Sequence, residues 1–238
     1  MNFDNYLLFF NKFLLTFVFC CAILGLASRS TRRFLMLKIY KLRLCDPIDH
    51  AAQELKKYLR MMMPRCGEID ICYTPEAKDG FRLGLLEDFG LPCEAEDVVL
   101  DDIVHIDTDC SSGILAGSNP RSVLFAVYRF LKKQGCIWLF PGSDGEKIPM
   151  VRELKPVDYL HKAPLRYRGQ CNEGGETQPL MMDIIDFTPK IGMNIFMMEF
   201  DNPKVYYDNY YDRAGNESRE KEPVSADQVL QWKRQCEA

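Results

Sequence analysis

Apolar residues recur at helical spacing in one part of this chain and form strand-like runs in the next, most clearly in the segment 113–149. Its sequence is GILAGSNPRSVLFAVYRFLKKQGCIWLFPGSDGEKIP. After Pro120, apolar residues recur every three to four positions, at Val123, Val127, Phe130 and Leu131. This spacing predicts an amphipathic helix that packs on a β-sheet.

The same segment carries signals for the start and end of that helix. Ser118 or Asn119 can cap the first turn, and Pro120 is tolerated there because its missing N–H would have no partner. Gly135 can take the left-handed conformation that ends a helix. The apolar residues 136–140 follow and predict a buried strand. Together these features predict one unit of an α/β layer.

Earlier patterns extend this layer toward the N-terminus. A strand is predicted from Met36, and a helix is predicted from Asp46 until Pro64 ends it. Short strands over 69–73 and 81–86 follow, because apolar runs there are divided by proline and glycine. A sheet with helices on one or both faces is therefore expected.

An acidic stretch follows, with no Lys or Arg between Arg82 and Arg121. Strand alternation over 99–109 would place four polar residues on one face: Asp101, His105, Asp107 and Asp109. One interpretation is a divalent-metal site, and the other is a solvated outer face over a buried inner face with Val104 and Ile106. The second is favoured because ten residues of strand are too long for one coordination sphere, so we predict no metal site.

A change of pattern marks a second domain. Residues 147–163 have no clear period and contain prolines, and a strand over 165–171, a helix over 181–191 and a strand over 193–200 follow. The expected organisation is a leader, an α/β domain, a linker and a second β-α-β region with a final helix, over residues 1–35, 36–150, 151–163 and 164–238. The fold class is therefore α/β.

Composition excludes several classes of function. The chain has 238 residues, a net charge of −4 and 47% hydrophobic residues, and its basic residues are scattered, which argues against a nucleic-acid partner. A phosphate-binding loop is absent, so no nucleotide or other cofactor is predicted. His50 stands alone on its helix and is interpreted as a surface or satisfied histidine. Nothing in the sequence indicates an oligomeric state.

The ten cysteines and the apolar leader give opposite indications of location. No CxxC pair is present, so free thiols in a reducing, cytoplasmic compartment are the simpler interpretation. The run Phe13–Ala27 has the length of a signal-peptide core and is short for a membrane span. A signal or anchor, with membrane contact confined to this run, and a misassigned start codon both remain open.

The segment 113–149 resembles the end of the α/β domain that precedes the catalytic barrel in glycoside hydrolases of the α-glucuronidase and β-N-acetylhexosaminidase type. The resemblance is carried by an Asn-Pro-Arg helix start, a Leu-x-x-Val-Tyr-x-x-Leu helix and a Gly-Cys-x-Trp-x-x-Pro-Gly exit. Further on, Tyr167-Arg168-Gly169 and Gly192-Met193-Asn194 resemble the opening of the barrel in the hexosaminidase-like families. The implied fold is a small α/β sandwich domain followed by the first β-α-β-α of an incomplete TIM barrel.

The same resemblance implies site residues. In the hexosaminidase family the arginine of the Arg-Gly pair binds sugar hydroxyls, which gives Arg168 that role here, and an acidic residue follows at Glu173. Asn194 and Glu199 stand near the ends of the second predicted strand, where barrel enzymes place their sites. We expect Arg168 to face the open end of the barrel with Asn194 or Glu199. An ion pair that closes the barrel floor is the alternative for Arg168.

The expected function is therefore that of a glycoside hydrolase fragment with a carbohydrate substrate. The chain is expected to be C-terminally truncated and inactive alone, because the strands that carry the acid and base are missing, and its catalytic residues are unknown. The alternative is a non-catalytic carbohydrate-binding or docking α/β protein.

Overall fold

The structure is a computed structural model that describes residues 37–172, 178–198, 209, 215 and 225–237. The predicted leader 1–35, with its apolar run, and the side chains of Glu173 and Glu199 lie outside these residues. Within the described part of the chain, no helix has both the length and the apolar content needed to cross a membrane.

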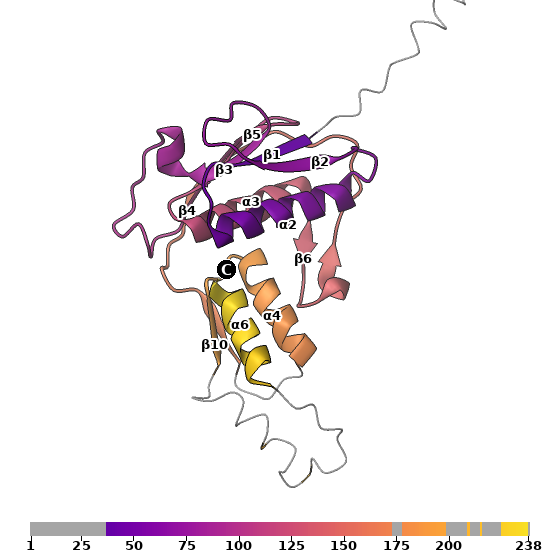
Figure 1. Cartoon of the computed structure of the whole chain (residues 1–238), viewed down its shortest axis with the longest axis vertical. Helices are drawn as coiled ribbons and strands as arrows, with labels where there is room; N and C mark the ends of the chain where they lie inside the picture. Colours follow the sequence, from indigo (N-terminus) through magenta and orange to yellow (C-terminus); the bar gives the residue numbers. More distant parts are fainter. Residues whose placement is uncertain (1–36, 173–177, 199–208, 210–214, 216–224, 238) are drawn as a thin grey trace, which may run out of the picture. The chain divides into compact units, whose positions relative to one another are not determined.

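A six-stranded, mostly parallel sheet forms one layer of the fold (Figure 1). Its strands are, in spatial order, β2 (Ile69–Tyr73), β1 (Leu37–Lys41), β3 (Phe81–Leu85), β5 (Gly113–Gly117), β4 (Ile103–Thr108) and β8 (Val157–Lys162). The first four are parallel to one another, whereas β4 pairs antiparallel with both β5 and β8. The predicted α/β class is confirmed.

Two helices, α2 (Asp46–Met62) and α3 (Pro120–Gln134), lie side by side on one face of this sheet (Figure 1). Their apolar stripes and the inward side chains of the strands form one core, with fully buried Leu55, Phe81 and Phe130 among its members. The Phe81 and Phe130 rings lie 5.5 Å apart. The helical spacing seen in the sequence therefore reports burial against the sheet.

The acidic strand has a solvated outer face and a buried inner face, the second of the two interpretations of its sequence. Along β4, Val104 and Ile106 are buried, whereas His105 is half-buried and Asp107 is exposed on the opposite face. Asp101 lies before β4 and is not part of the alternating face. The strand is thus a solvated outer face over an apolar inner one.

The end signals of α3 act as the sequence predicts. The Asn119 side chain accepts a hydrogen bond from the Ser122 N–H at 2.9 Å, and Gly135 has a φ of 106°. At Gly117, a Cβ atom would lie 2.5 Å from the backbone of Ser122, so only glycine lets β5 approach the first turn of α3 this closely. The α2 helix begins at Asp46 as predicted, but its cap position is occupied by Cys45, which forms no side-chain cap hydrogen bond.

The prediction that residues 136–140 form a buried strand of the sheet is wrong. Only β6 (Ile137–Trp138) forms, and it pairs with β7 (Glu146–Lys147) in a separate two-stranded ribbon. Within the run, Cys136 and Trp138 are buried, and Trp138 packs edge-on against Tyr58 and Tyr128 at ring distances of 5.4 and 5.5 Å. The other three residues are exposed. Short 3-10 helices, η1 (Leu86–Phe89) and η2 (Ser143–Gly145), complete the connections.

The predicted linker 151–163 also requires correction. Its second half is β8, which pairs with β4 along its whole length, from Thr108 opposite Val157 to Ile103 opposite Lys162. The six-stranded sheet is closed on this side by β8, so the α/β layer extends at least to Lys162 rather than to residue 150. Of the prolines that suggested a linker, Pro156 directly precedes this edge strand, where it removes no hydrogen bond from the sheet.

The second region has the predicted β-α-β-α order. It contains β9 (Gly169–Asn172), α4 (Gln178–Lys190), β10 (Ile195–Met198) and α6 (Ala226–Glu237). β9 and β10 are parallel, and Met181, Ile185 and Trp232 form a small core between the helices. Ser225 and Gln228 form a capping box at the start of α6, in which each side chain accepts from the other residue's backbone N–H.

Candidate functional site

Arg168 and Asn194 lie at the amino ends of the two parallel strands. Arg168 immediately precedes β9, and Asn194 immediately precedes β10, whose Ile195 pairs with Gly169. The expectation that Arg168 faces the open, carboxyl end of the barrel is therefore wrong in its placement. The cause is the strand register: β9 begins four residues after the predicted start at Leu165, so a residue read as part of the strand precedes it.

Both side chains converge on Asp102, which precedes β4 in the α/β layer. Arg168 Nη2 donates to Asp102 Oδ2 at 2.6 Å, and Asn194 Nδ2 donates to the same oxygen at 3.1 Å. The other oxygen, Oδ1, accepts from Ser122 Oγ at 2.7 Å and from Arg121 at 3.0 Å. The Asp102 side chain is only 2% exposed, so one buried carboxylate joins the two regions of the chain.

The charge of Asp102 is maintained by these donors. Burial acts to raise the pKa of this carboxyl, but the hydrogen bonds from Arg168 and Ser122 and the charge of Arg121 outweigh it, and the pKa is lowered overall. Asp102 is therefore an ionised hydrogen-bond acceptor near neutral pH. An ionised carboxylate has no proton to donate, so this arrangement does not favour a general-acid role for Asp102.

Other contacts hold Arg168 in place. Its Nε donates to the Gly192 carbonyl at 2.8 Å, its Nη1 donates to the Leu165 carbonyl at 2.5 Å, and the guanidinium lies 5.6 Å from the centre of the Phe125 ring. Asn194 accepts from the Arg168 N–H at 2.9 Å. This arrangement favours the ion-pair interpretation of Arg168. Sugar binding by Arg168 and Asn194 stays a prediction from the resemblance.

A second ion pair runs beside the first. Arg166 Nε donates to Asp101 Oδ1 at 2.6 Å, and Asp101 Oδ2 accepts from the backbone N–H groups of Glu96 and Asp97 at 2.9 and 3.1 Å. The hydrogen bond from Arg166 is the main cause that lowers the pKa of Asp101 to about 2, and the backbone hydrogen bonds add to it. Two adjacent aspartates thus meet two arginines that alternate along the segment before β9.

The low pKa of Asp101 predicts an acid-dependent loss of stability. A carboxyl whose pKa falls on folding stabilises the folded state above its ordinary pKa of about 3.9, and that contribution disappears as the pH falls toward about 2. We expect the difference in free energy of unfolding between the natural protein and Asp101→Asn to be largest at neutral pH and to shrink below about pH 4. Urea denaturation at several pH values measures it. A difference that keeps the same pH dependence in an Arg166→Gln background would contradict this assignment.

A third cluster lies at the end of α4. Lys190 Nζ, in a side chain only 4% exposed, donates to Glu146 Oε1 at 2.8 Å and to Asp186 Oδ2 at 2.5 Å. Glu146 also accepts from the Tyr58 hydroxyl at 2.6 Å, which in turn accepts from Trp138 Nε1 at 3.1 Å. Burial acts to lower the pKa of Lys190, but the hydrogen bonds with Asp186 and Glu146 outweigh it and raise the pKa. The cluster ties α4 to α2 and the β6–β7 ribbon.

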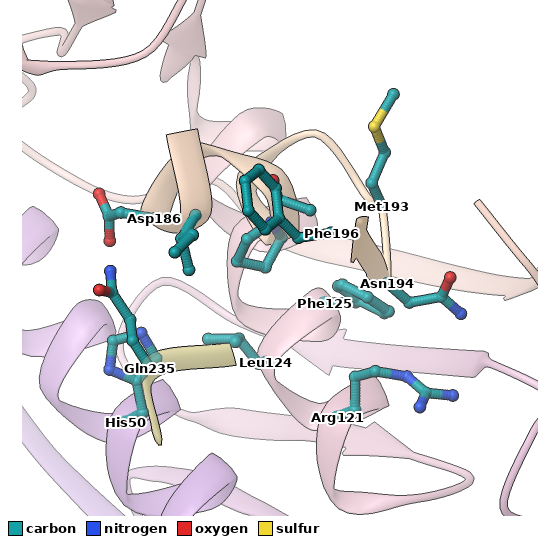
Figure 2. Close-up of a pocket in the computed structure, with 12 residues that line it drawn as sticks. His50, Arg121, Leu124, Phe125, Asp186, Met193, Asn194, Phe196 and Gln235 are labelled. Carbon is teal, nitrogen blue, oxygen red and sulfur yellow. The ribbon is translucent and has the colours of Figure 1, made fainter. Parts of the chain in front are cut away.

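Two cavities border these ion pairs. The first, of about 280 Å³, is lined by α2, α3, α4, α6 and the residues around β10. Figure 2 shows His50 of α2 and Gln235 of α6 on the same side of this cavity. The half-buried His50 therefore lies beside a cavity rather than on an open surface. The second cavity, of about 200 Å³, lies between α3, β8 and the turn after α4.

The carboxyl ends of β9 and β10 form the opposite edge of the small sheet. Asn172 and Met198 pair there, and Glu173 and Glu199 follow them directly in the sequence but lie outside the described residues. Over the ranges that the structure describes, no group of three or more His, Cys, Asp or Glu side chains is placed to hold a metal ion.

Asp101, Asp102 and Lys190 are parts of this junction that were not predicted from the sequence. A signal for the first two was present: two adjacent aspartates precede an apolar strand, and Arg166 and Arg168 alternate before another. For Lys190 the local signal is Asp186, four residues earlier on the same helix. Its other contacts, Glu146 and Tyr58, are 44 and 132 positions away and have no local signal.

Comparison with known proteins gives distant structural neighbours only. No family model matches the sequence, and no curated protein matches it. Three solved structures with partial likeness are a GH20 β-N-acetylhexosaminidase from Streptomyces coelicolor A3(2), the GH84 protein CpGH84D and a GH138 enzyme targeting pectin rhamnogalacturonan II. Their TM-scores are 0.42, 0.43 and 0.43, and their sequence identities are 12%, 16% and 12%.

These neighbours cover 68%, 83% and 83% of this chain, but the chain covers only 30%, 31% and 28% of theirs. The chain therefore spans less than a third of the length of the structures to which it is similar. These three neighbours are proteins of the glycoside hydrolase class. TM-scores below 0.5 carry no argument about this chain's activity, so its function is inferred below from its own residues.

Proposed function

We propose that this chain supplies the N-terminal α/β domain and the first two strands of a (β/α)8 glycosidase. The observation that carries the proposal is the parallel pairing of β9 and β10 in register, with α4 as the crossover between them. In barrel enzymes the site lies at the carboxyl ends of such strands. Here that edge is formed by Asn172 and Met198.

The exposed apolar side chains of the two-stranded sheet support the proposal that further strands complete it. Parallel sheets are normally buried on both faces, and two strands alone are too few for a stable sheet. The Met197 side chain is 54% exposed and Ile195 is 36% exposed, although both lie on a parallel strand. Additional strands, from this polypeptide or a complementing one, would bury them as a barrel does.

Glu173 and Glu199 are the proposed carboxylates of the sugar site. They directly follow two paired residues of neighbouring strands, and neighbouring strands lie about 4.8 Å apart. Hydrolysis of a glycosidic bond normally uses two carboxyl groups on either side of that bond. Glu173 and Glu199 would contact the sugar. The catalytic acid and its partner carboxylate would come from later strands of the barrel.

In this proposal Arg168 and Asn194 are positioning residues. They attach the amino ends of β9 and β10 to buried Asp102, which fixes the direction in which the carboxyl ends of both strands point. The α/β domain then acts as a rigid support for the beginning of the barrel. The motifs shared with the hexosaminidase-like families would be retained for this reason.

The chain alone is expected to hydrolyse no glycoside. Two strands cannot enclose a substrate, and a site open to water gives neither carboxyl the environment that raises the pKa of a catalytic acid. We expect no turnover of aryl β-N-acetylglucosaminide, glucuronide or glucoside above that of a Glu173→Gln/Glu199→Gln double variant. Turnover above the double variant would show that these two strands already contain the catalytic residues.

The coding sequence after the Ala238 codon separates this proposal from a non-catalytic carbohydrate-binding or docking protein. Further β-α units with paired acidic residues at a later strand end, translated in any frame, would support the glycosidase. The longer protein should then hydrolyse at least one of the three substrates and lose that activity on Glu173→Gln or Glu199→Gln. If the longer protein folds and binds sugars but hydrolyses none of the three substrates, the non-catalytic carbohydrate-binding function would be favoured.

A further inference from the structure

The second cavity, called the junction cavity here, is rich in cationic side chains. Four of the residues that line it carry or can carry a positive charge without belonging to the Lys190 cluster: Arg129, Lys132, His161 and Arg168. They come from α3, from β8 and from the segment before β9. The α/β layer and the second region therefore both contribute to the cavity wall.

The negative charge in this cavity is already neutralised. Asp102 is its one carboxylate among the described lining residues, and it accepts hydrogen bonds from Arg121 and Arg168. Across the described ranges, neither Arg129 nor Lys132 forms an ion pair or a hydrogen bond with a carboxylate. Arg129, which is half-buried, and Lys132, which is exposed, thus line the cavity without a carboxylate partner among the described residues.

Aromatic contacts fix the direction of the Arg129 side chain. Its guanidinium lies 5.3 Å from the centre of the Tyr159 ring, and Tyr159 stacks with His161 at 5.9 Å. Lys133 lies 5.0 Å from the same ring. A guanidinium held over an aromatic ring keeps its N–H donors free in its own plane. The cationic groups are therefore partly organised without any anion.

We propose that the junction cavity binds a small oxyanion, either a phosphate or sulfate group or the carboxylate of a sugar acid. Arg129 and Lys132 would supply charge-assisted hydrogen bonds, and Arg168 retains N–H donors beyond the three it uses. About 200 Å³ is below the usual size of pockets for larger ligands, which favours a single small anionic group or a monosaccharide acid. This site lies at the amino ends of β9 and β10 and does not depend on the proposed glycosidase function.

A ligand in this cavity contacts both regions of the chain, so its binding should stabilise the folded protein. The experiment uses the full chain with sodium phosphate, sodium sulfate and sodium glucuronate in separate titrations at constant ionic strength. Thermal unfolding and isothermal titration calorimetry are the measurements. We expect a saturable rise in Tm with at least one of the three anions.

Arg129→Gln and Lys132→Gln should each weaken that binding by about tenfold or more, because each removes a charge-assisted hydrogen bond. The matched control is Arg60→Gln, an exposed arginine in the last turn of α2 that lines neither cavity, and it should leave the affinity unchanged. Binding of phosphate and sulfate without glucuronate identifies a tetrahedral anion, and the reverse identifies a sugar acid. Non-saturable effects, or equal losses in Arg60→Gln, would overturn the proposal.

Discussion

Replacing Asp102 by alanine is expected to lower the free energy of unfolding by about 3–5 kcal/mol, the range for breaking a buried ion pair by removing one partner. Asp102 accepts hydrogen bonds from Arg168, Asn194, Arg121 and Ser122, and its side chain is almost fully buried. Without the carboxylate, the partly buried Arg168 guanidinium, 18% exposed, keeps its charge but loses its counter-charge. Urea denaturation measures the loss.

The matched control for Asp102 is Asp107→Ala on the adjoining strand β4. Asp107 is exposed, so its replacement should change the free energy of unfolding by no more than about 0.5 kcal/mol. If Asp102→Ala fails to fold, Asp102→Asn keeps the shape of the side chain and allows the measurement. Combining either variant with Arg168→Ala should cost less than the sum of the two single changes, since both act on one pair. Additive costs would show that the two residues do not interact.

Replacing Lys190 by methionine is expected to cost about 3 kcal/mol, the lower end of the same range. The change leaves Glu146 and the Tyr58 hydroxyl at a nearly closed site without the ammonium group that pairs with Glu146. Asp186 reduces the penalty, because its side chain is 37% exposed and can turn to solvent. The midpoint of urea denaturation, with Lys78→Met as an exposed control, measures the effect.

A second change tests the cause of that loss. Glu146→Gln removes the stranded negative charge, so the Lys190→Met/Glu146→Gln double variant should recover part of the stability lost in Lys190→Met. Recovery would assign the loss to an unpaired buried carboxylate. A double variant that is less stable than Lys190→Met by the full cost of Glu146→Gln alone would instead show that Lys190 contributes mainly by packing.

The local features of this fold could be predicted from the sequence because their causes are local. The α3 helix begins at Asn119 and Pro120 and ends at Gly135 as expected, since capping and left-handed stops involve residues within one turn. The capping box at Ser225 follows the same rule. Helical spacing also identified the face of α3 that is buried on the sheet.

Features that depend on pairing between distant residues could not be predicted. β8 pairs with β4 across about fifty positions, and its pattern VDYLHK gives weak alternation because it is an edge strand. The run 136–140 is as apolar as a buried strand, but three of its five residues are exposed, and Trp138 packs on Tyr58 of α2 and Tyr128 of α3. Arg168 was assigned a role by motif resemblance, but its contacts are set by Asp102, 66 positions earlier. The local motif around Arg168 does not indicate which distant residue will form its ion pair.

The distance in sequence between Asp102 and its partners has a consequence for synthesis of the chain. Arg121 follows Asp102 after 19 residues, whereas Arg168 and Asn194 follow after 66 and 92. At about 5–20 residues per second, the ribosome adds Arg168 roughly 3–13 seconds after Asp102. During that interval Arg121, whose pairing needs only β4, β5 and α3, is the first cation that can neutralise the carboxylate. Asp102 can therefore pair with Arg121 before the second region is synthesised, and Arg168 and Asn194 then join a carboxylate that already has one cationic partner.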